Sequence, residues 1–219
     1  MNADLVRKTK RTTTVRKHER GAYDRDTVYS IIDSTPLCHV SYIIDSWPYV
    51  TPTIQWREDN RIFWHGSSAS RFLRQITDKP ACLAVTQFDG IVLARSASHH
   101  SANYRSVMLF GTAEALSGKE KDRALESFME SMFPSRWGQL RPMTETESKS
   151  TAVLSMAIDE GSAKIRTGHS VDEEDDYALS IWAGVIPIIQ KVGVPEPDPK
   201  NLPGLPIPKH VSEFKLGHP

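Results

Sequence analysis

Cysteine is scarce in this chain of 219 residues, which holds only two, and long apolar runs are missing. Cys38 and Cys82 lie in apolar stretches without a C-x-x-C motif, so we expect no disulfide framework but free, buried thiols in a reducing compartment. The longest apolar run near the end, 181–189, contains Pro187 and is too short to cross a bilayer. These features predict a cytoplasmic protein with no membrane partner.

An excess of charge of either sign is also missing, because 27 Lys and Arg balance 27 Asp and Glu. No global field therefore favours nucleic acid as a partner. The sequence contains neither the P-loop motif nor G-x-G-x-x-G nor H-E-x-x-H. Adjacent His99 and His100 would point to opposite faces of a strand, with no carboxylate or Cys nearby, so we expect no metal site.

Apolar periodicity and turn residues predict a mainly β protein. Helical patterns occur after Asp24, at 68–78 and at 118–133, and Thr144 begins a capping box. Pro52 places its part of a strand at an edge or a bulge, and Asp89-Gly90 is a signal for a hairpin turn. The β-rich runs are 37–44, 49–57, 61–65, 81–88, 91–97, 107–116 and 151–158. We expect one antiparallel barrel of roughly six strands with helices outside.

Composition divides the chain into three parts. Residues 1–20 are basic, lack the apolar core of a secretory signal, and are expected to form a disordered arm. Residues 21–190 form the predicted barrel domain. Residues 191–219 are rich in proline and are expected to pack on the domain or on a partner subunit.

The stretch 63–76, Phe-Trp-His-Gly-Ser-Ser-Ala-Ser-Arg-Phe-Leu-Arg-Gln-Ile, predicts a strand, a tight turn and a helix. Unpaired N–H groups at a helix start, together with Arg71 and Arg74, suit a phosphate group. The alternative is a capped helix, with Ser68 or Ser70 as N-cap and two solvated arginines.

A polar stretch, 96–106, interrupts the later strands. Its Ser, His, Asn, Tyr and Arg side chains offer the edge donors and the stacking surface that a planar heteroaromatic ligand needs. A solvated loop explains the same composition.

Together these residues resemble a known family. The segments Phe-Trp-His-Gly-Ser-Ser-Ala-Ser-Arg and Val-Leu-Ala-Arg-Ser-Ala-Ser-His-His-Ser-Ala-Asn-Tyr-Arg-Ser-Val look like the pyridoxamine 5′-phosphate oxidase-related flavin proteins, nearest to the nitroimidazole-resistance branch. The likeness runs from about residue 16 to 188. It implies a six-stranded split β-barrel of Greek-key type, in a homodimer that binds FMN in two clefts between the subunits.

The resemblance also implies roles for individual residues. The phosphate would be bound by Ser70 and Arg71, helped by Gly66 and Ser67, and the substrate side of the flavin would be faced by His65 with His99 or His100. The ribityl chain and the ring would be contacted by Thr51, Thr53, Tyr104, Arg105 and Ser106. Ser106 stands where the oxidases have Gln, and their Arg-x-His signature is not recognisable.

We therefore expect an FMN-dependent oxidoreductase that acts on an unknown small molecule, with a nitroaromatic compound as one candidate. Vitamin B6 oxidation is not expected. One alternative is a flavin-binding sensor or reservoir without catalysis. Another is a haem-binding split-barrel protein in which His99 or His100 is the axial ligand.

Overall fold

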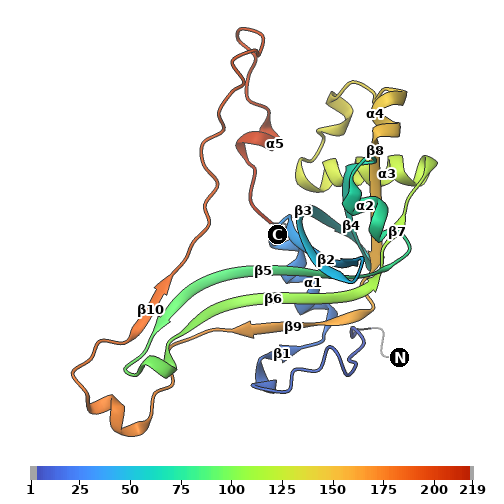
Figure 1. Ribbon diagram of the computed structural model, residues 1–219. Coiled ribbons are helices and arrows are strands. Elements are labelled where there is room, and N and C mark those ends of the chain that lie inside the picture. The colour runs from blue at the N-terminus through green and yellow to red at the C-terminus, as the bar shows by residue number, and fades with distance from the viewer. Residues whose placement is uncertain (1–3, 218–219) are drawn as a thin grey trace.

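The computed structural model describes residues 4–217, and its framework is an antiparallel sheet of ten strands with helices around it (Figure 1). The hydrogen-bonded order is β1-β9-β6-β5-β2-β3-β4-β8-β7, and β10 pairs with β5. The strands are β1 (Gly21–Ala22), β2 (Leu37–Ile44), β3 (Trp47–Glu58), β4 (Arg61–Ser67), β5 (Pro80–Leu93), β6 (Ser101–Thr112), β7 (Glu114–Ala115), β8 (Thr151–Ala157), β9 (Glu160–Arg166) and β10 (Gly184–Pro187). The helices are α1 (Arg25–Asp33), α2 (Arg71–Ile76), α3 (Gly118–Met132), α4 (Glu145–Ser150) and α5 (Lys209–Ser212).

The sheet curves into a split barrel because β6 continues almost directly into β7. Ala113, which separates them, forms a bridge with Thr77, and β7 then pairs with β8 at the far end of the strand order. The prediction of a mainly β barrel with outer helices is confirmed. The expectation of six strands counted neither β9 nor the short strands β1, β7 and β10.

The prediction of a hairpin turn at Asp89-Gly90 is wrong. β5 passes through these residues with only a β-bulge between Phe88 and Gly90, and its true return lies at the 3₁₀ turn Ala97–His99. The polar residues from Ser101 onward are strand, paired with β5 and then β9. Around Gly90, β5 is paired with β6 on one side and with β10 on the other. These long-range backbone hydrogen bonds override the local turn signal.

Two apolar clusters hold the barrel and its cover. The larger one fills the barrel interior and includes the fully buried Trp64, Leu83 and Leu109. The smaller one lies between the sheet and α3 and contains Trp56, Phe63, Ala124, Leu125 and Val153. Phe63 and Trp64 are neighbours in β4 but belong to different clusters, because successive strand residues face opposite sides.

Local capping signals determined the starts of two helices. The Asp24 side chain accepts the Thr27 N–H at the start of α1, and Thr144 and Glu147 form the predicted capping box at α4. α2 is shorter than predicted, since its first residue is Arg71 and not Ser68. Pro52 lies in the half of β3 that pairs with β2 alone, in agreement with its predicted edge position.

Residues 4–20 of the segment expected to be a disordered arm pack on β9 in the structure, and residues 1–3 lie outside the described residues. Val6 is buried, and its N–H donates to the Tyr23 carbonyl. The carboxylate of Glu160, itself buried, binds Arg7 at 3.1 Å and Arg11 at 2.7 Å. Ion pairing to a single buried carboxylate thus anchors a segment whose composition favoured disorder.

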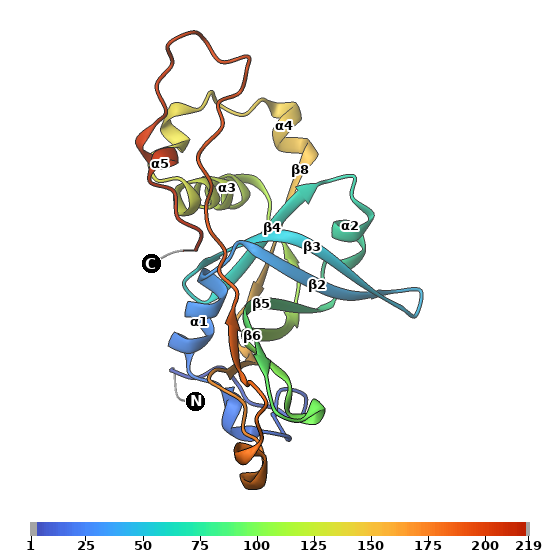
Figure 2. The ribbon, with the colours of Figure 1, turned by 90° about the vertical axis from the view of Figure 1, so that its left-hand side faces the viewer.

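The proline-rich C-terminal segment leaves β10, extends beyond the barrel and returns to it at α5 (Figure 2). On its return Phe214 stacks on Phe133 at the end of α3, with ring centroids 5.3 Å apart. None of the helices within residues 4–217 is long and apolar enough to span a membrane.

Candidate functional site

The turn between β4 and α2 is closed by its own serines. The Ser70 N–H donates to the Ser67 carbonyl at 2.9 Å, and the Ala69 N–H donates to the Ser67 hydroxyl at 3.2 Å. A Cβ added at Gly66 would lie 3.1 Å from the buried Leu73, so this glycine lets the turn pack closely on α2. Ser70 occupies the N-cap position, but its hydroxyl does not cap the helix and stays free for another acceptor.

Arg71 begins α2 and holds an exposed guanidinium above the β2–β3 hairpin. Its guanidinium carbon lies 5.7 Å from the centre of the Tyr49 ring, and Nη2 lies 3.8 Å from the carboxylate of the exposed Asp45. Both contacts are weak at this exposure. The guanidinium is therefore oriented by its neighbours but retains donors for an anion.

Beside Arg71 the hairpin presents a polar and aromatic surface. The hydroxyls of Thr51 and Tyr42 are 2.9 Å apart, and the Tyr42 ring stacks on Tyr49 with centroids 5.6 Å apart. Phe72 of α2 packs on the same ring at 5.0 Å. Thr53 lies two residues further along β3, half-buried. The sequence analysis missed Tyr42 and Tyr49, although their positions on either side of the Asp45-Ser46 turn make them cross-strand partners.

The second group of predicted residues lies on the long β5–β6 hairpin. Arg105 binds Asp89 through two hydrogen bonds of 2.8 and 3.0 Å, and this pairing raises the pKa of Arg105. The Ser106 hydroxyl donates to the Lys164 carbonyl, and Tyr104 faces Phe88 across the strands. Arg105 is thus engaged within its own hairpin, whereas Ser106 is bonded to the neighbouring strand β9.

The predicted histidine pair lies at the tip of this hairpin. His100 is exposed, with Nδ1 2.9 Å from the Ser96 carbonyl. His99 Nδ1 lies 3.4 Å from Asp172, whose buried carboxylate also binds Arg95 at 3.0 Å. The two side chains have different partners, and no cluster of three or more His, Cys, Asp or Glu suited to a metal occurs in residues 4–217. Asp172 thereby attaches the loop that follows β9 to the β5–β6 hairpin.

His65 lies on the α3 side of β4, next to the smaller apolar cluster. Its ring is 4.8 Å from Phe128 and 5.9 Å from Trp56, centre to centre. Nδ1 is buried without a hydrogen-bond partner among the described residues, and burial lowers the pKa of this imidazole. At neutral pH His65 is therefore a neutral ring in aromatic surroundings.

Apart from His65, which lies on the α3 side of β4, the structure brings the predicted residues into two groups. One surrounds the start of α2 and the other follows the β5–β6 hairpin to its tip, and the two lie at different ends of the molecule in both ribbon views (Figures 1 and 2). Within one chain they do not form a single cleft.

The fold and the turn at 66–71 define the class of protein, and comparison with known proteins agrees. A family model described as pyridoxamine 5′-phosphate oxidase matches residues 24–165, more than half of the chain. The chain therefore belongs to this family. A search of curated proteins finds no match.

Several solved structures share the fold. The flavocytochrome Anf3 from Azotobacter vinelandii is 46% identical, with a TM-score of 0.92 over 95% of this chain and 98% of that one. An FAD- and haem-binding protein from Mycobacterium smegmatis is 32% identical, with a TM-score of 0.86 over 90% and 98%. A protein from Bacteroides thetaiotaomicron described as a 5-nitroimidazole antibiotic resistance protein is 18% identical, with a TM-score of 0.55 over 66% of this chain and 86% of that one. At this identity the likeness supports the fold alone.

Proposed function

We propose that this protein binds a flavin nucleotide and transfers electrons through it to or from a small molecule. The observation that carries this proposal is that Ser70 and Arg71, adjacent at the start of α2, offer an uncommitted hydroxyl and an exposed guanidinium beside the Tyr49 and Thr51 surface. A guanidinium and a hydroxyl suit a phosphate group, which FMN and FAD both carry. Gly66 and Ser67 shape the turn that places them. A bound flavin supplies hydride or single-electron chemistry, whereas these residues bind and orient it.

FMN and FAD share the riboflavin phosphate and differ in the adenosine monophosphate group that only FAD carries. The family resemblance implies FMN, whereas one close relative is named for FAD. Mass spectrometry of the chromophore released from purified protein separates the two. A colourless protein that takes up neither flavin on reconstitution would contradict the proposal.

We also propose that the working form is a homodimer with the flavin cleft between the subunits. The face of the sheet opposite the barrel core is apolar and exposed at Leu37, Ile43, Val50, Ile54 and Met108, where a second copy would cover it. In this arrangement the hairpin of one subunit brings Tyr104, Arg105 and Ser106 toward the α2 turn of the other. Sedimentation equilibrium gives the mass directly, and a monomer that binds flavin tightly would refute the shared cleft.

Catalysis requires a group that exchanges protons near the flavin. His65 is neutral at physiological pH and its Nδ1 is unpaired among the described residues, so it can accept a proton without first breaking a hydrogen bond. His100 is the more available of the two hairpin histidines, because His99 lies against Asp172. Reduction of the bound flavin by NADH or NADPH under anaerobic conditions tests the catalytic proposal. Flavin that neither donor reduces would favour a sensor or reservoir instead.

A second function, haem binding alongside the flavin, is favoured by a specific observation. Two relatives that cover at least nine-tenths of this chain are named a flavocytochrome and an FAD- and haem-binding protein. The absorption spectrum of the purified protein shows a Soret band if haem is bound. If an oxidised flavin is bound, the spectrum shows its near-ultraviolet and blue bands. Flavin bands without any haem uptake on titration would remove the second function and leave the first.

A further inference from the structure

A long arm of the chain, residues 188–207, stands away from the barrel between β10 and α5 (Figure 1). It contains no helix or strand. At its first residue the Ile188 N–H donates to the Asp89 carbonyl at 3.1 Å, so the arm begins at the bulge of β5. Loops of this length without secondary structure are uncommon in compact domains and usually have a function.

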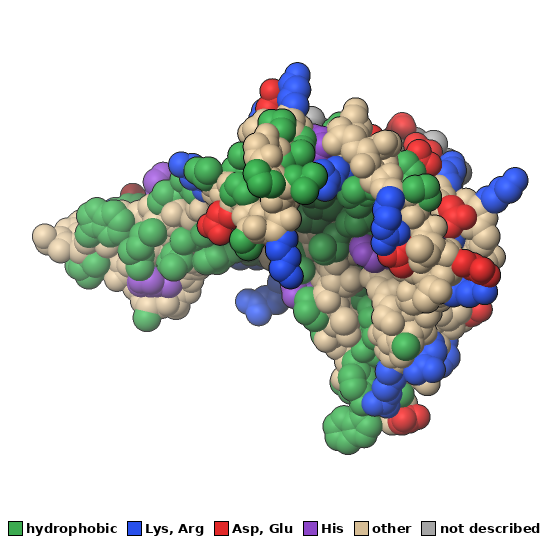
Figure 3. Space-filling model, turned by 90° about the horizontal axis from the view of Figure 1, so that it is seen from above, with side chains coloured by type: hydrophobic (Ala, Val, Ile, Leu, Met, Phe, Trp, Pro, Cys, Tyr) green, Lys and Arg blue, Asp and Glu red, His purple; other side chains and the backbone are tan. Residues whose placement is uncertain are grey.

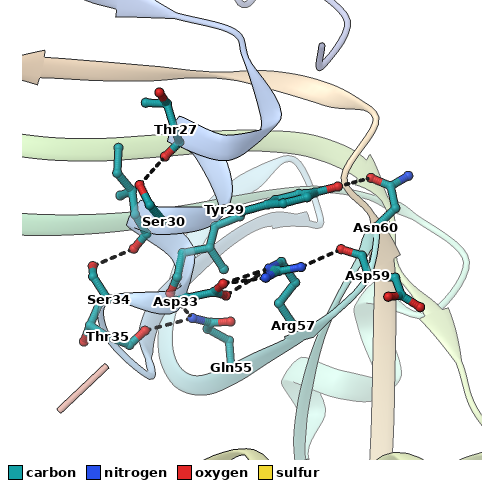
Figure 4. Close-up of polar contacts among 12 residues, drawn as sticks. Thr27, Tyr29, Ser30, Asp33, Ser34, Thr35, Gln55, Arg57, Asp59 and Asn60 are labelled. Atoms are coloured by element: carbon teal, nitrogen blue, oxygen red, sulfur yellow. Dashed lines mark hydrogen bonds and ion pairs between the residues drawn. The ribbon is translucent and has the colours of Figure 1, made fainter. Parts of the chain in front are cut away.

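The far end of the arm is attached to a rigid part of the barrel. α5 and the residues after it form one wall of a cavity of about 790 Å³, whose other walls come from α1, β3 and α3. There the Gln55 amide donates to the carbonyls of Ile32 and Thr35, which ties β3 to the end of α1 (Figure 4). Gly217 packs on the same place, since a Cβ added to it would lie 2.6 Å from the Ser34 carbonyl oxygen. Both ends of the arm are therefore fixed.

Between its ends the arm makes little use of its own barrel. Every residue of the arm except Pro195 is exposed. After its first residue, the hydrogen bonds of the arm to other described residues join only positions within the arm. Its apolar side chains are open too, with Ile189, Val194 and Leu202 exposed to 82%, 88% and 76%. An exposed apolar segment of this kind is typical of an interaction site.

Proline gives the arm a restricted shape. Five prolines limit the backbone φ angle and remove N–H donors, at positions Pro195, Pro197, Pro199, Pro203 and Pro206. A segment that is already restricted loses less conformational entropy when it binds a partner. Because these prolines cannot donate to a strand ladder, the arm would bind through its side chains.

The exposed area of the whole chain favours a second copy as the partner. The chain has a mass of 24.6 kDa and exposes 14210 Å². A compact folded monomer of this mass exposes about 10,000 Å², so the excess is about 4,000 Å². Obligate homodimers bury about 2,000–5,000 Å² or more over both subunits. The excess on each chain is therefore enough for such an interface.

The arm begins beside the surface that the proposed dimer uses. β10 pairs with residues 90–93 of β5 and β2 pairs with residues 82–84, both on the edge of β5 opposite β6. Seen from above, the β5–β6 hairpin with β10 and the β2–β3 hairpin form two projections that meet at an angle, and hydrophobic side chains gather on both (Figure 3). A second copy placed in this angle would meet the arm and the apolar sheet face together.

We propose that the arm of each subunit wraps over the other subunit of a homodimer, so that the two arms clasp the pair. The inference rests on the homodimer of the proposed function and adds the segment that holds it together. A two-fold contact is isologous, so one interface covers both arms. The arm carries Lys191 and Lys200 against Glu196 and Asp198, and this balance favours neither an anionic lipid surface nor nucleic acid.

A photo-crosslinker in place of Leu202 tests whether the arm reaches the second copy. A benzophenone side chain at this position of the full-length protein is expected to give, on irradiation, a covalent product of twice the chain mass. The same group in place of Glu126, exposed on α3, is the control and should give little of that product. Unchanged flavin content and far-UV circular dichroism would show that both proteins are folded.

A charge on the arm tests whether the contact holds the dimer. Leu202→Glu should weaken dimerisation at least tenfold in sedimentation velocity, because the charge would be buried without a partner. Trypsin should cut slowly after Lys191 and Lys200 in the wild-type dimer and at least tenfold faster in the variant. Leu202→Met keeps an apolar side chain of similar size and should behave as wild type.

The outcomes separate the clasp from the proposed function. A dimer that binds flavin, but whose crosslinker at position 202 reacts only within its own chain, refutes the clasp and leaves the proposed homodimer standing. A monomer that retains flavin refutes both the clasp and the homodimer and leaves flavin binding intact. Irradiation in intact cells that gives a product of another mass, with none at twice the chain mass, would show that a different protein covers the arm.

Discussion

Arg105 and Asp89 face each other across the β5–β6 hairpin at the point where β5 contains its bulge. The register passes from Phe88 directly to Gly90, so Asp89 is the extra residue and has no cross-strand partner of its own. Its carboxylate instead binds the Arg105 guanidinium at 2.8 and 3.0 Å. A β-bulge commonly redirects one side chain in this way. The pair fixes the direction of a side chain that the family resemblance places near the flavin.

The Asp89–Arg105 pair is therefore expected to couple measurably. A double-mutant cycle with Asp89→Asn and Arg105→Gln should give a coupling free energy of about 0.2–1 kcal/mol, small because both side chains are about one-third exposed. Urea denaturation of the four proteins measures it. Strictly additive effects would show that the pair does not form in solution.

Arg71 is the residue to test for phosphate binding. Replacing it with alanine should weaken flavin binding by about 1.5–3 kcal/mol, the worth of a charged hydrogen bond. Arg74→Ala removes the same charge from the exposed side of the same helix and should have a much smaller effect. Fluorescence titration with the apoprotein measures both. Equal flavin affinity in the Arg71→Ala variant and the wild type would refute the assignment.

His65 should make the protein less stable in acid. Burial lowers its pKa in the folded state below the ordinary value of 6.5, so the unfolded state binds more protons between the two values. The free energy of unfolding should fall as the pH drops below about 6.5, and His65→Gln should reduce this dependence. Urea denaturation from pH 7.5 to 5.0 measures the slope, with the exposed His169→Gln as control. An identical slope in the His65→Gln variant would contradict the prediction.

Glu160 should control attachment of the N-terminal segment. Its buried carboxylate accepts hydrogen bonds from Thr9 at 2.7 Å and Arg7 at 3.1 Å, and the Thr9 bond followed by the charge of Arg11 lowers its pKa. Glu160→Gln is expected to cost about 1–3 kcal/mol of stability and to speed tryptic cleavage within residues 4–20. Glu126→Gln, exposed on α3, is the control. Unchanged cleavage would show that the segment is held by other contacts.

Val50 tests the proposed dimer face. Its side chain is exposed on the outer side of β3, where a two-fold contact would bring two copies close together. Val50→Glu should weaken dimerisation by roughly tenfold or more, about 1.4 kcal/mol or more, through burial of an unpaired charge. Val171→Glu, the control, changes a still more exposed valine outside this face. Sedimentation velocity at several concentrations compares them, and an unaffected Val50→Glu dimer would place the interface elsewhere.

Elements with local signals could be predicted from the amino-acid sequence alone. The Asp24 cap, the Thr144–Glu147 capping box, the β4 turn at Gly66 and the apolar alternation of the strands needed only neighbours along the chain. Those signals were sufficient for the antiparallel barrel class and for the stretch that begins α2.

Contacts between residues far apart in the sequence could not be predicted from it and became visible only in the tertiary structure. The Asp89-Gly90 signal predicted a turn, but strands on both sides of β5 turned it into a bulge. Composition predicted a disordered N-terminal arm, but the buried Glu160 attaches it to β9. The cavity beneath α5 involves residues more than 150 positions apart, such as Trp56 and His210, and no local pattern reports their approach. Local chemistry therefore specified the turn that can hold a phosphate, whereas long-range packing decided which side chains remain free to bind a ligand.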